Sequence, residues 1–141
     1  MGLRGPAELQ LRAAIALSPL NTRARNTLGQ LLFAAGRPNE AEEQFRASLR
    51  SSPNAFAYDY LGMLNIRRRA VGEAARDFRA ALSLEEFDSY AHFGLGDICT
   101  LAGRKAEAIS QYEAGLAKDP TNPQALAAVQ KLRQQSAGTA P

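Results

Sequence analysis

Side chains that could carry out catalysis are few in this sequence, and they lie far apart. It contains a single histidine, His92, and a single cysteine, Cys99, so it lacks the clustered ligands that a zinc site needs. Adjacent carboxylates at 42–43 and 85–86 would diverge by about 100° on a helix, which prevents them from acting as a pair. No glycine-rich phosphate loop, CxxC pair or nucleophile elbow is present. We therefore expect no enzyme activity, metal or cofactor, and we expect Cys99 to be a buried apolar residue.

The arginines offer a second kind of chemistry, the binding of phosphates. Arg67, Arg68 and Arg69 are consecutive, Arg76 and Arg79 follow, and basic clusters beside aromatic side chains are typical of proteins that hold single-stranded nucleic acid. Acidic residues at 59, 73 and 77 lie near this run, and the net charge of the chain is only +3. Nucleic-acid binding stays an alternative that we do not favour.

These side chains are positioned by a repeat. The dipeptide Leu-Gly recurs at 28–29, 61–62 and 95–96, which are 33 and then 34 residues apart. An alanine follows each glycine by twelve residues and an aromatic residue by sixteen; they are Ala41, Ala74 and Ala108, then Phe45, Phe78 and Tyr112. Pro53 and Pro120 close two of the units, and Glu86 holds that place in the middle one. A repeat of this length is typical of stacked helical hairpins.

The hairpins define the expected organisation of the chain. We predict one domain over residues 1–135, with a half repeat at 5–19, repeats at about 22–54, 55–88 and 89–122, and an end-capping helix at 123–135 that Asn122 caps. Residues 136–141 are expected to be a disordered tail. Within a unit, the glycine should let the second helix approach where the alanine faces it. The aromatic residue should fill the space between one hairpin and the next.

This pattern resembles the tetratricopeptide repeat, a helix–turn–helix unit with Leu-Gly, then Ala-x3-Phe, then Pro. The resemblance covers roughly residues 5–133, and its departures are local: the leading Trp position holds Arg25, Tyr58 and His92. It implies an all-α, right-handed superhelical solenoid whose concave face is lined by the first helix of each hairpin. It also implies a protein–protein interaction module that binds a peptide or a partner helix on that face.

The resemblance assigns a set of residues to the peptide-binding groove. Aromatic side chains and Met at such positions favour interaction hot spots, and we expect Arg67 and Asp59 to supply selectivity. The groove residues are Asn26, Gln30, Phe33, Phe56, Asp59, Tyr60, Met63, Arg67, Tyr90, Phe93 and Asp97. Chaperone-tail binding is not expected, because the positions that clamp a carboxylate in that subtype hold Asn26, Gln30, Tyr60, Tyr90 and Gly94, with no cationic pair.

The ends of the chain suggest another interface. A solenoid that begins on an unpaired second helix exposes Leu9, Leu11 and Ile15 unless something covers them. This open end favours either self-association or a position at the C-terminus of a larger protein that carries an enzymatic or membrane-bound part. No apolar stretch of about 18 residues is present, and polar residues interrupt the N-terminus. We expect no membrane insertion and no secretory signal, which favours the cytoplasm; the periplasm stays open for a fragment of an exported protein.

Overall fold

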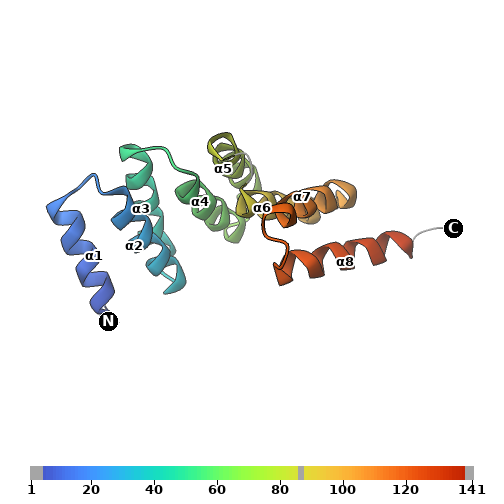
Figure 1. Ribbon diagram of the computed structural model, residues 1–141, viewed down its shortest axis with the longest axis horizontal. Coiled ribbons are helices and arrows are strands. Elements are labelled where there is room, and N and C mark those ends of the chain that lie inside the picture. The colour runs from blue at the N-terminus through green and yellow to red at the C-terminus, as the bar shows by residue number, and fades with distance from the viewer. Residues whose placement is uncertain (1–4, 86–87, 139–141) are drawn as a thin grey trace.

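The computed structural model describes residues 5–85 and 88–138, and all regular secondary structure in these residues is α-helical. The helices stack in chain order into an elongated body with α1 and α8 at opposite ends (Figure 1). They are α1 (Pro6–Leu17), α2 (Thr22–Ala34), α3 (Pro38–Ser51), α4 (Ala55–Arg67), α5 (Val71–Leu84), α6 (Ser89–Leu101), α7 (Lys105–Lys118) and α8 (Pro123–Ala137). The prediction of an all-α solenoid is confirmed.

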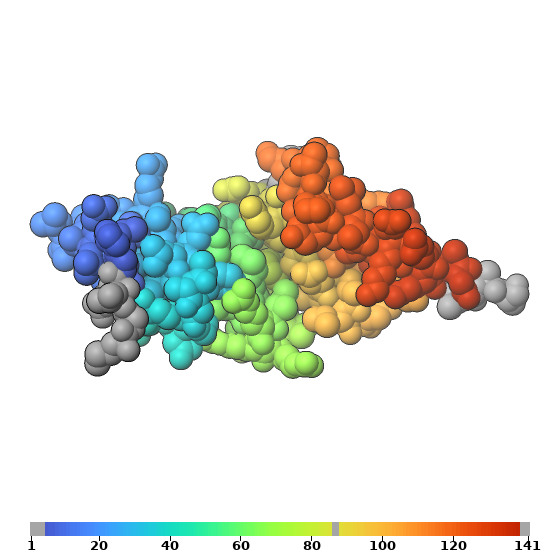
Figure 2. Space-filling view, turned by 90° about the horizontal axis from the view of Figure 1, so that it is seen from below, coloured from blue at the N-terminus to red at the C-terminus, as the bar shows by residue number. Residues whose placement is uncertain are grey.

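The closest packing joins α2 to α3, α4 to α5 and α6 to α7, so each pair is one hairpin. The helix α1 packs on α2, and α8 packs on α7. Seen from below, the hairpins follow one another as successive bands along the body (Figure 2). Each unit therefore contacts mainly its neighbours, as expected of a repeat protein.

A capping side chain starts the first helix of every hairpin. The N-caps of α2, α4, α6 and α8 are Asn21, Asn54, Asp88 and Asn122, and the side chain of each accepts a hydrogen bond from a backbone N–H in the first turn. Such a cap stabilises a helix by about 1 kcal/mol. The predicted cap Asn122 is confirmed, and the other three lie at the same place in their units.

The turn inside each hairpin contains one residue with a left-handed backbone. Gly36 has φ of 71° and Gly103 has φ of 72°, the left-handed conformation that commonly ends a helix. The middle hairpin places Arg69 there, with φ of 61°. The three turns also share a backbone hydrogen bond: the N–H groups of these residues donate to Phe33, Thr100 and Ile66 respectively.

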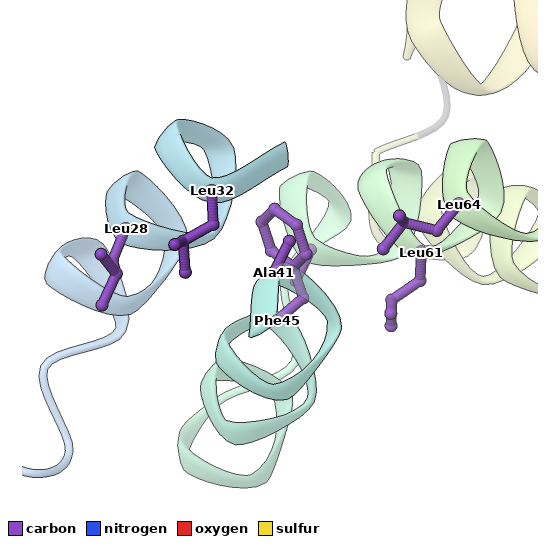
Figure 3. Close-up of a cluster of buried hydrophobic side chains, with 7 residues drawn as sticks. Leu28, Leu32, Ala41, Phe45, Leu61 and Leu64 are labelled. Carbon is purple, nitrogen blue, oxygen red and sulfur yellow. The ribbon is translucent and has the colours of Figure 1, made fainter. Parts of the chain in front are cut away.

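The core lies between helices of successive hairpins. In Figure 3, Ala41 and Phe45 of α3 point between Leu28 and Leu32 on α2 and Leu61 and Leu64 on α4. One expectation needs correction: the aromatic ring, and not only the alanine, faces the repeat glycine. A Cβ on Gly29 would lie 2.7 Å from Phe45, and one on Gly62 would lie 2.7 Å from Phe78. Cys99 is buried, as predicted.

The C-terminal boundary also differs from the prediction. The helix α8 continues to Ala137, so Ser136 and Ala137 are helical, and the Ser136 hydroxyl donates to the Leu132 carbonyl. The predicted helix end at 135 was therefore two residues too early. Glu86 and the last three residues of the expected tail lie outside the described residues. In the part of the chain that is described, no helix combines the length and apolarity needed to cross a bilayer.

Candidate functional site

The helices α2, α4 and α6 form one face of the solenoid, here called the first-helix face. The helix α4 contacts both α2 and α6, whereas no comparable contact joins α3 to α5 or α5 to α7 in the described residues. The first helices therefore lie closer together than the second helices. This places the first-helix face on the inner side of the curve, where the resemblance expects the groove.

Aromatic rings of α2 and α4 gather on this face. The Tyr60 ring stacks on Phe45 with centroids 4.9 Å apart, and it meets Phe33 edge to face at 5.3 Å. Phe56 lies 4.9 Å from Tyr60. Phe45 is fully buried, while Phe56 keeps 39% of its surface exposed. The aromatic cluster, defined as Phe33, Phe56 and Tyr60, thus connects the core to an open surface.

Two predicted groove residues, Arg67 and Gln30, interact with this cluster. The guanidinium of Arg67 lies 4.0 Å from the centroid of the Phe33 ring, a geometry that allows a cation–π interaction. Burial raises the pKa of the Tyr60 hydroxyl, and a hydrogen bond with Gln30 opposes that shift. Tyr60 is therefore neutral at physiological pH and remains a hydrogen-bonding group beside the rings.

A cleft of about 450 Å³ adjoins the cluster. It runs along α2 and ends at the exposed side of Phe56 on α4, and its lining is Thr22, Arg23, Asn26, Thr27, Gln30 and Phe56. Gln30 and Arg23 are exposed there. The Asn26 amide is held from behind, since its Nδ2 donates to Asn54 Oδ1 at 2.9 Å. The cleft therefore offers polar side chains along one wall and an aromatic ring at its end.

Asp59 does not reach this cleft, and its expected role in selectivity needs correction. Its side chain lies at the junction between the second and third hairpins, and the residue is only 5% exposed. It occupies in α4 the place that Asn26 occupies in α2, and Asp88 occupies the place of Asn54. The amide–amide pair of one junction is thus an acid–carboxylate pair in the next.

The protonation of this pair follows from its surroundings. Burial raises the pKa of Asp59 to about 9, and the charges of Asp88 and Glu85 and a hydrogen bond to Asp88 add to the shift. Asp88 meanwhile caps α6, because its Oδ1 accepts from the Tyr90 N–H at 3.0 Å. A protonated Asp59 therefore supplies at this junction the donor that an amide supplies at the other.

The third hairpin contributes less to the groove than expected. Tyr90 is 65% exposed and is available to a partner. Phe93 instead turns toward α7, where its ring would lie 2.4 Å from a Cβ on Gly115. Asp97 accepts a hydrogen bond from the Tyr112 hydroxyl at 2.6 Å. Met63, on α4, is partly buried against the core around Phe78. Of the predicted set, Asn26, Gln30, Phe33, Phe56, Tyr60 and Arg67 of α2 and α4 come together, whereas Asp59 and Met63 of α4 and the residues of α6 do not.

The basic run does not form one surface. Arg67 lies on Phe33, whereas Arg68 forms an ion pair with Glu42 at 2.5 Å and donates to Asn39 at 3.0 Å. Because one cation is neutralised by α3 and another lies on an aromatic ring, a phosphate backbone would not meet three free cations. His92 contacts Gln111 through Nδ1 at 3.0 Å, which is a structural contact between α6 and α7.

The N-terminal helix docks through charges that sequence reasoning missed. Glu8 is 2% exposed, and its carboxylate pairs with Arg37 at 2.7 Å and with Arg12 at 2.9 Å. Arg37 also pairs with Glu40 at 2.7 Å. A hydrogen bond from Arg37 holds the pKa of Glu8, and likewise that of Glu40, below the usual range. A signal was available: Glu8 and Glu42 both follow the repeat alanine, and each pairs with an arginine of the next turn.

The expected open-end interface needs a partial correction. Leu9 is exposed, but Leu11 and Ile15 are half-buried and pack against the core between α2 and α4. The helix period explains the difference, because Leu11 and Ile15 are four residues apart and share the face that α1 turns inward. Leu17 and Leu20 are the other large apolar residues exposed at this end.

The sequence and fold of this chain resemble those of known proteins. The tetratricopeptide repeat family model matches residues 7–56 and 61–123. No curated protein sequence matches the chain. Similar solved structures include MamA, with a TM-score of 0.76 and 21% identity over 92% of this chain and 77% of that one.

Two further structures show the same fold. PilF of Pseudomonas aeruginosa has a TM-score of 0.82 and 21% identity over 93% of this chain, which spans 60% of its length. The first such repeat domain of Spaghetti (RPAP3), bound to an HSP90 peptide, has a TM-score of 0.76 and 21% identity over 82% of this chain and 95% of that one.

Proposed function

Because the chain belongs to the tetratricopeptide repeat family, whose fold serves protein–protein interaction, we propose that it binds a peptide or a partner helix on its first-helix face. The contact is centred on the aromatic cluster between α2 and α4. The observation that carries the proposal is Phe56, whose ring packs against the tilted ring of Tyr60 on one side and borders a cleft of about 450 Å³ on the other. Ring surface that is held in place yet open to solvent is typical of interaction hot spots.

The chemistry of the cleft suggests how a partner would be held. An apolar side chain of the partner packs on Phe56, while the exposed polar groups of Arg23 and Gln30 pair with its backbone. The rings are already packed against one another, so little side-chain freedom is lost on binding. Arg67 supplies the positive charge at the far side of the cluster and becomes the selectivity residue in place of Asp59.

Peptide binding by a similar fold supports the proposal in general terms, since the Spaghetti (RPAP3) domain was solved with an HSP90 peptide bound. The details differ here. The positions expected to hold a carboxylate clamp include Tyr60 and Gly94, which are not cationic. The proposed ligand is therefore anchored by an apolar side chain and not by its C-terminal carboxylate.

The test compares exposed apolar residues on two parts of the solenoid. Phe56→Ala and Tyr90→Ala remove rings on the first-helix face, and Leu126→Ala removes an exposed apolar side chain of α8 as a matched control. After circular dichroism has shown equal helicity, each protein captures partners from host lysate, and the captured partner is titrated by calorimetry. We expect the ring variants to bind at least about tenfold more weakly. Equal binding by all variants overturns the proposal.

Self-association is a second candidate function. Leu9, Leu17 and Leu20 are exposed at the N-terminal end, although Leu11 and Ile15 are turned inward. We propose this end as the contact between two copies if the chain forms a homo-oligomer. Sedimentation of the parent and of Leu9→Gln with Leu17→Gln tests it: a dimer that dissociates in the variant supports the contact, and a monomeric parent excludes it.

A further inference from the structure

A second pocket lies at the turn edge of the middle hairpin, away from the cleft at Phe56. Its volume is about 440 Å³, and it is lined by the end of α4, the turn between α4 and α5, the start of α5 and the end of α6. The lining consists of Ile66, Arg67, Arg69, Val71 and Leu101, here called the Arg69 pocket. Three of these residues are aliphatic, and Leu101 is 68% exposed. The pocket therefore has an apolar lining that is open to solvent.

The charge at this pocket is of one sign. Both of its charged lining residues are arginines, and no carboxylate lines it. Arg67 is held on the Phe33 ring. In the described residues Arg69 has no side-chain hydrogen bond or ion pair, unlike its neighbour Arg68, which Glu42 neutralises. Two cations beside an apolar lining thus lack an acidic counterpart within the described part of the chain.

The backbone of Arg69 adopts a conformation that is unusual for an arginine. Arg69 has φ of 61°, a region that favours glycine, and the equivalent residues of the other hairpins are Gly36 and Gly103. All three turns make the same backbone hydrogen bond, so the turn itself does not require an arginine. A side chain at this position strains the backbone and gains no partner within the described chain. Strain of this kind is typical of positions that serve a binding site.

We propose that the Arg69 pocket docks a protein segment in which an apolar residue is flanked by carboxylates. The apolar residue packs against Ile66, Val71 and Leu101, and a carboxylate binds between Arg67 and Arg69. Charge complementarity selects this partner, because the pocket offers two arginines and no acid. A nucleic acid fits less well, since the lining is aliphatic and offers no aromatic ring on which a base stacks. The pocket shares Arg67 with the edge of the aromatic cluster, but none of its lining residues lines the cleft at Phe56, so the inference goes beyond the function proposed above.

The experiment uses synthetic peptides as probes. A fluorescein-labelled, end-blocked peptide of alternating Glu and Leu is compared with peptides of Lys and Leu and of Glu and Ser, by anisotropy at low and physiological salt. We expect the full chain to bind only the Glu–Leu peptide, and more weakly as salt is added. Arg69→Gly and Leu101→Ser are each expected to weaken binding at least about fivefold. Arg50→Gln, which removes an exposed cation of α3, should change binding by less than about twofold.

Thermal melting separates binding from folding. Arg69→Gly is expected to melt at or above the temperature of the parent, because glycine relieves the left-handed strain. Weaker binding by a variant that is at least as stable supports the proposal. It is overturned if the parent does not bind the Glu–Leu peptide, or if Arg69→Gly binds it as the parent does. Loss of binding in Phe56→Ala with none in Arg69→Gly also overturns it and places the peptide in the first-helix cleft. Loss in Arg69→Gly with none in Phe56→Ala leaves the pocket standing without the cleft.

Discussion

The ring of Phe78 lies against Gly94 so closely that a Cβ there would be 2.2 Å from the Phe78 Cζ atom. One junction earlier, the equivalent partners are Phe45 and Tyr60, whose rings stack at 4.9 Å. The same place in the repeat is therefore filled by a ring at the first junction and by bare backbone at the second. This difference confines the aromatic cluster to the space between α2 and α4.

The contact with Gly94 predicts the effect of adding a single methyl group. Gly94→Ala and Gly62→Ala both place a Cβ against the buried Phe78 ring, and each should lower the free energy of unfolding by about 1–3 kcal/mol. Gly72→Ala is the matched control, because nothing lies within 4 Å of its Cβ and it should raise stability by about 0.5–1 kcal/mol. Urea denaturation measures all three. A neutral Gly94→Ala would contradict the packing described here.

The Asp59–Asp88 pair predicts a stability that falls as the pH rises. The folded pKa of Asp59, about 9, lies above its value in the unfolded chain, so the folded state binds the extra proton between about pH 4 and pH 9. The stability that protonated Asp59 contributes is fully present below about pH 4 and is lost as the pH rises through the folded pKa. One proton gives a slope of at most about 1.4 kcal/mol per pH unit.

Asp59→Asn tests this dependence, because the amide supplies the donor without titrating, as Asn26 does at the earlier junction. We expect the variant to melt close to the parent at pH 4 and above it at pH 8. Glu107→Gln, at an exposed ion pair, is the control and should leave the pH profile unchanged. Parallel profiles of parent and Asp59→Asn would rule out the protonated pair.

The charged cluster at Glu8 predicts that α1 is released by acid or by loss of Arg37. The pKa values of Glu8 and Glu40 are lowered in the fold, so their contribution is present above the unfolded pKa and is lost as the pH falls through the folded value. Arg37→Ala leaves a buried carboxylate with fewer partners, and hydrogen exchange should show faster exchange in α1 than in α4 or α6. Arg104→Ala, from an exposed pair, should leave α1 protected. Unchanged protection of α1 in Arg37→Ala would show that Arg37 is not needed to hold this helix.

Replacing the N-cap residue Asn54 is expected to cost more stability than replacing an ordinary N-cap residue. It accepts from the Ala57 N–H, accepts from Asn26 Nδ2, and donates to Ser48 Oγ at 3.1 Å. Asn54→Ala should therefore destabilise by about 2 kcal/mol, near the upper end for caps. Asn122→Ala, at the start of the end helix, should cost about 1 kcal/mol. Equal losses in the two variants, measured by calorimetric melting, would mean that the contact with Asn26 contributes nothing.

The sequence predicts the hairpins well because their determinants are local. The Leu-Gly, Ala and aromatic positions lie within one unit, and the turn residues Gly36 and Gly103 end helices by their own backbone preference. The groove was harder to predict. The repeat register places Phe93 and Asp97 on the first-helix face, but Gly115 leaves room that draws the Phe93 ring toward α7, and the Tyr112 hydroxyl engages Asp97.

Contacts between repeat units explain the other residues whose positions differ from the sequence-based expectation. Asp59 looks like an exposed charge within its own helix, but it is buried at the junction with the next hairpin, where it interacts with Asp88. Glu8 is buried for the same reason, through Arg37 of the following turn. Comparing equivalent positions across units reveals the first of these pairs, since Asn26 and Asn54 repeat as Asp59 and Asp88.

The uneven contacts between helices have a mechanical consequence. The first helices touch one another along the inner side, while α3, α5 and α7 share no comparable contact in the described residues. Each outer helix is linked to the next hairpin only through the first helix of that hairpin, so we expect a change in the bend of the solenoid to alter the spacing of α3, α5 and α7 more than that of α2, α4 and α6. Because the aromatic cluster bridges α2 and α4, any change in the bend at that joint alters the separation of its rings. The bend between the first two hairpins is therefore coupled to the shape of the binding surface at the aromatic cluster.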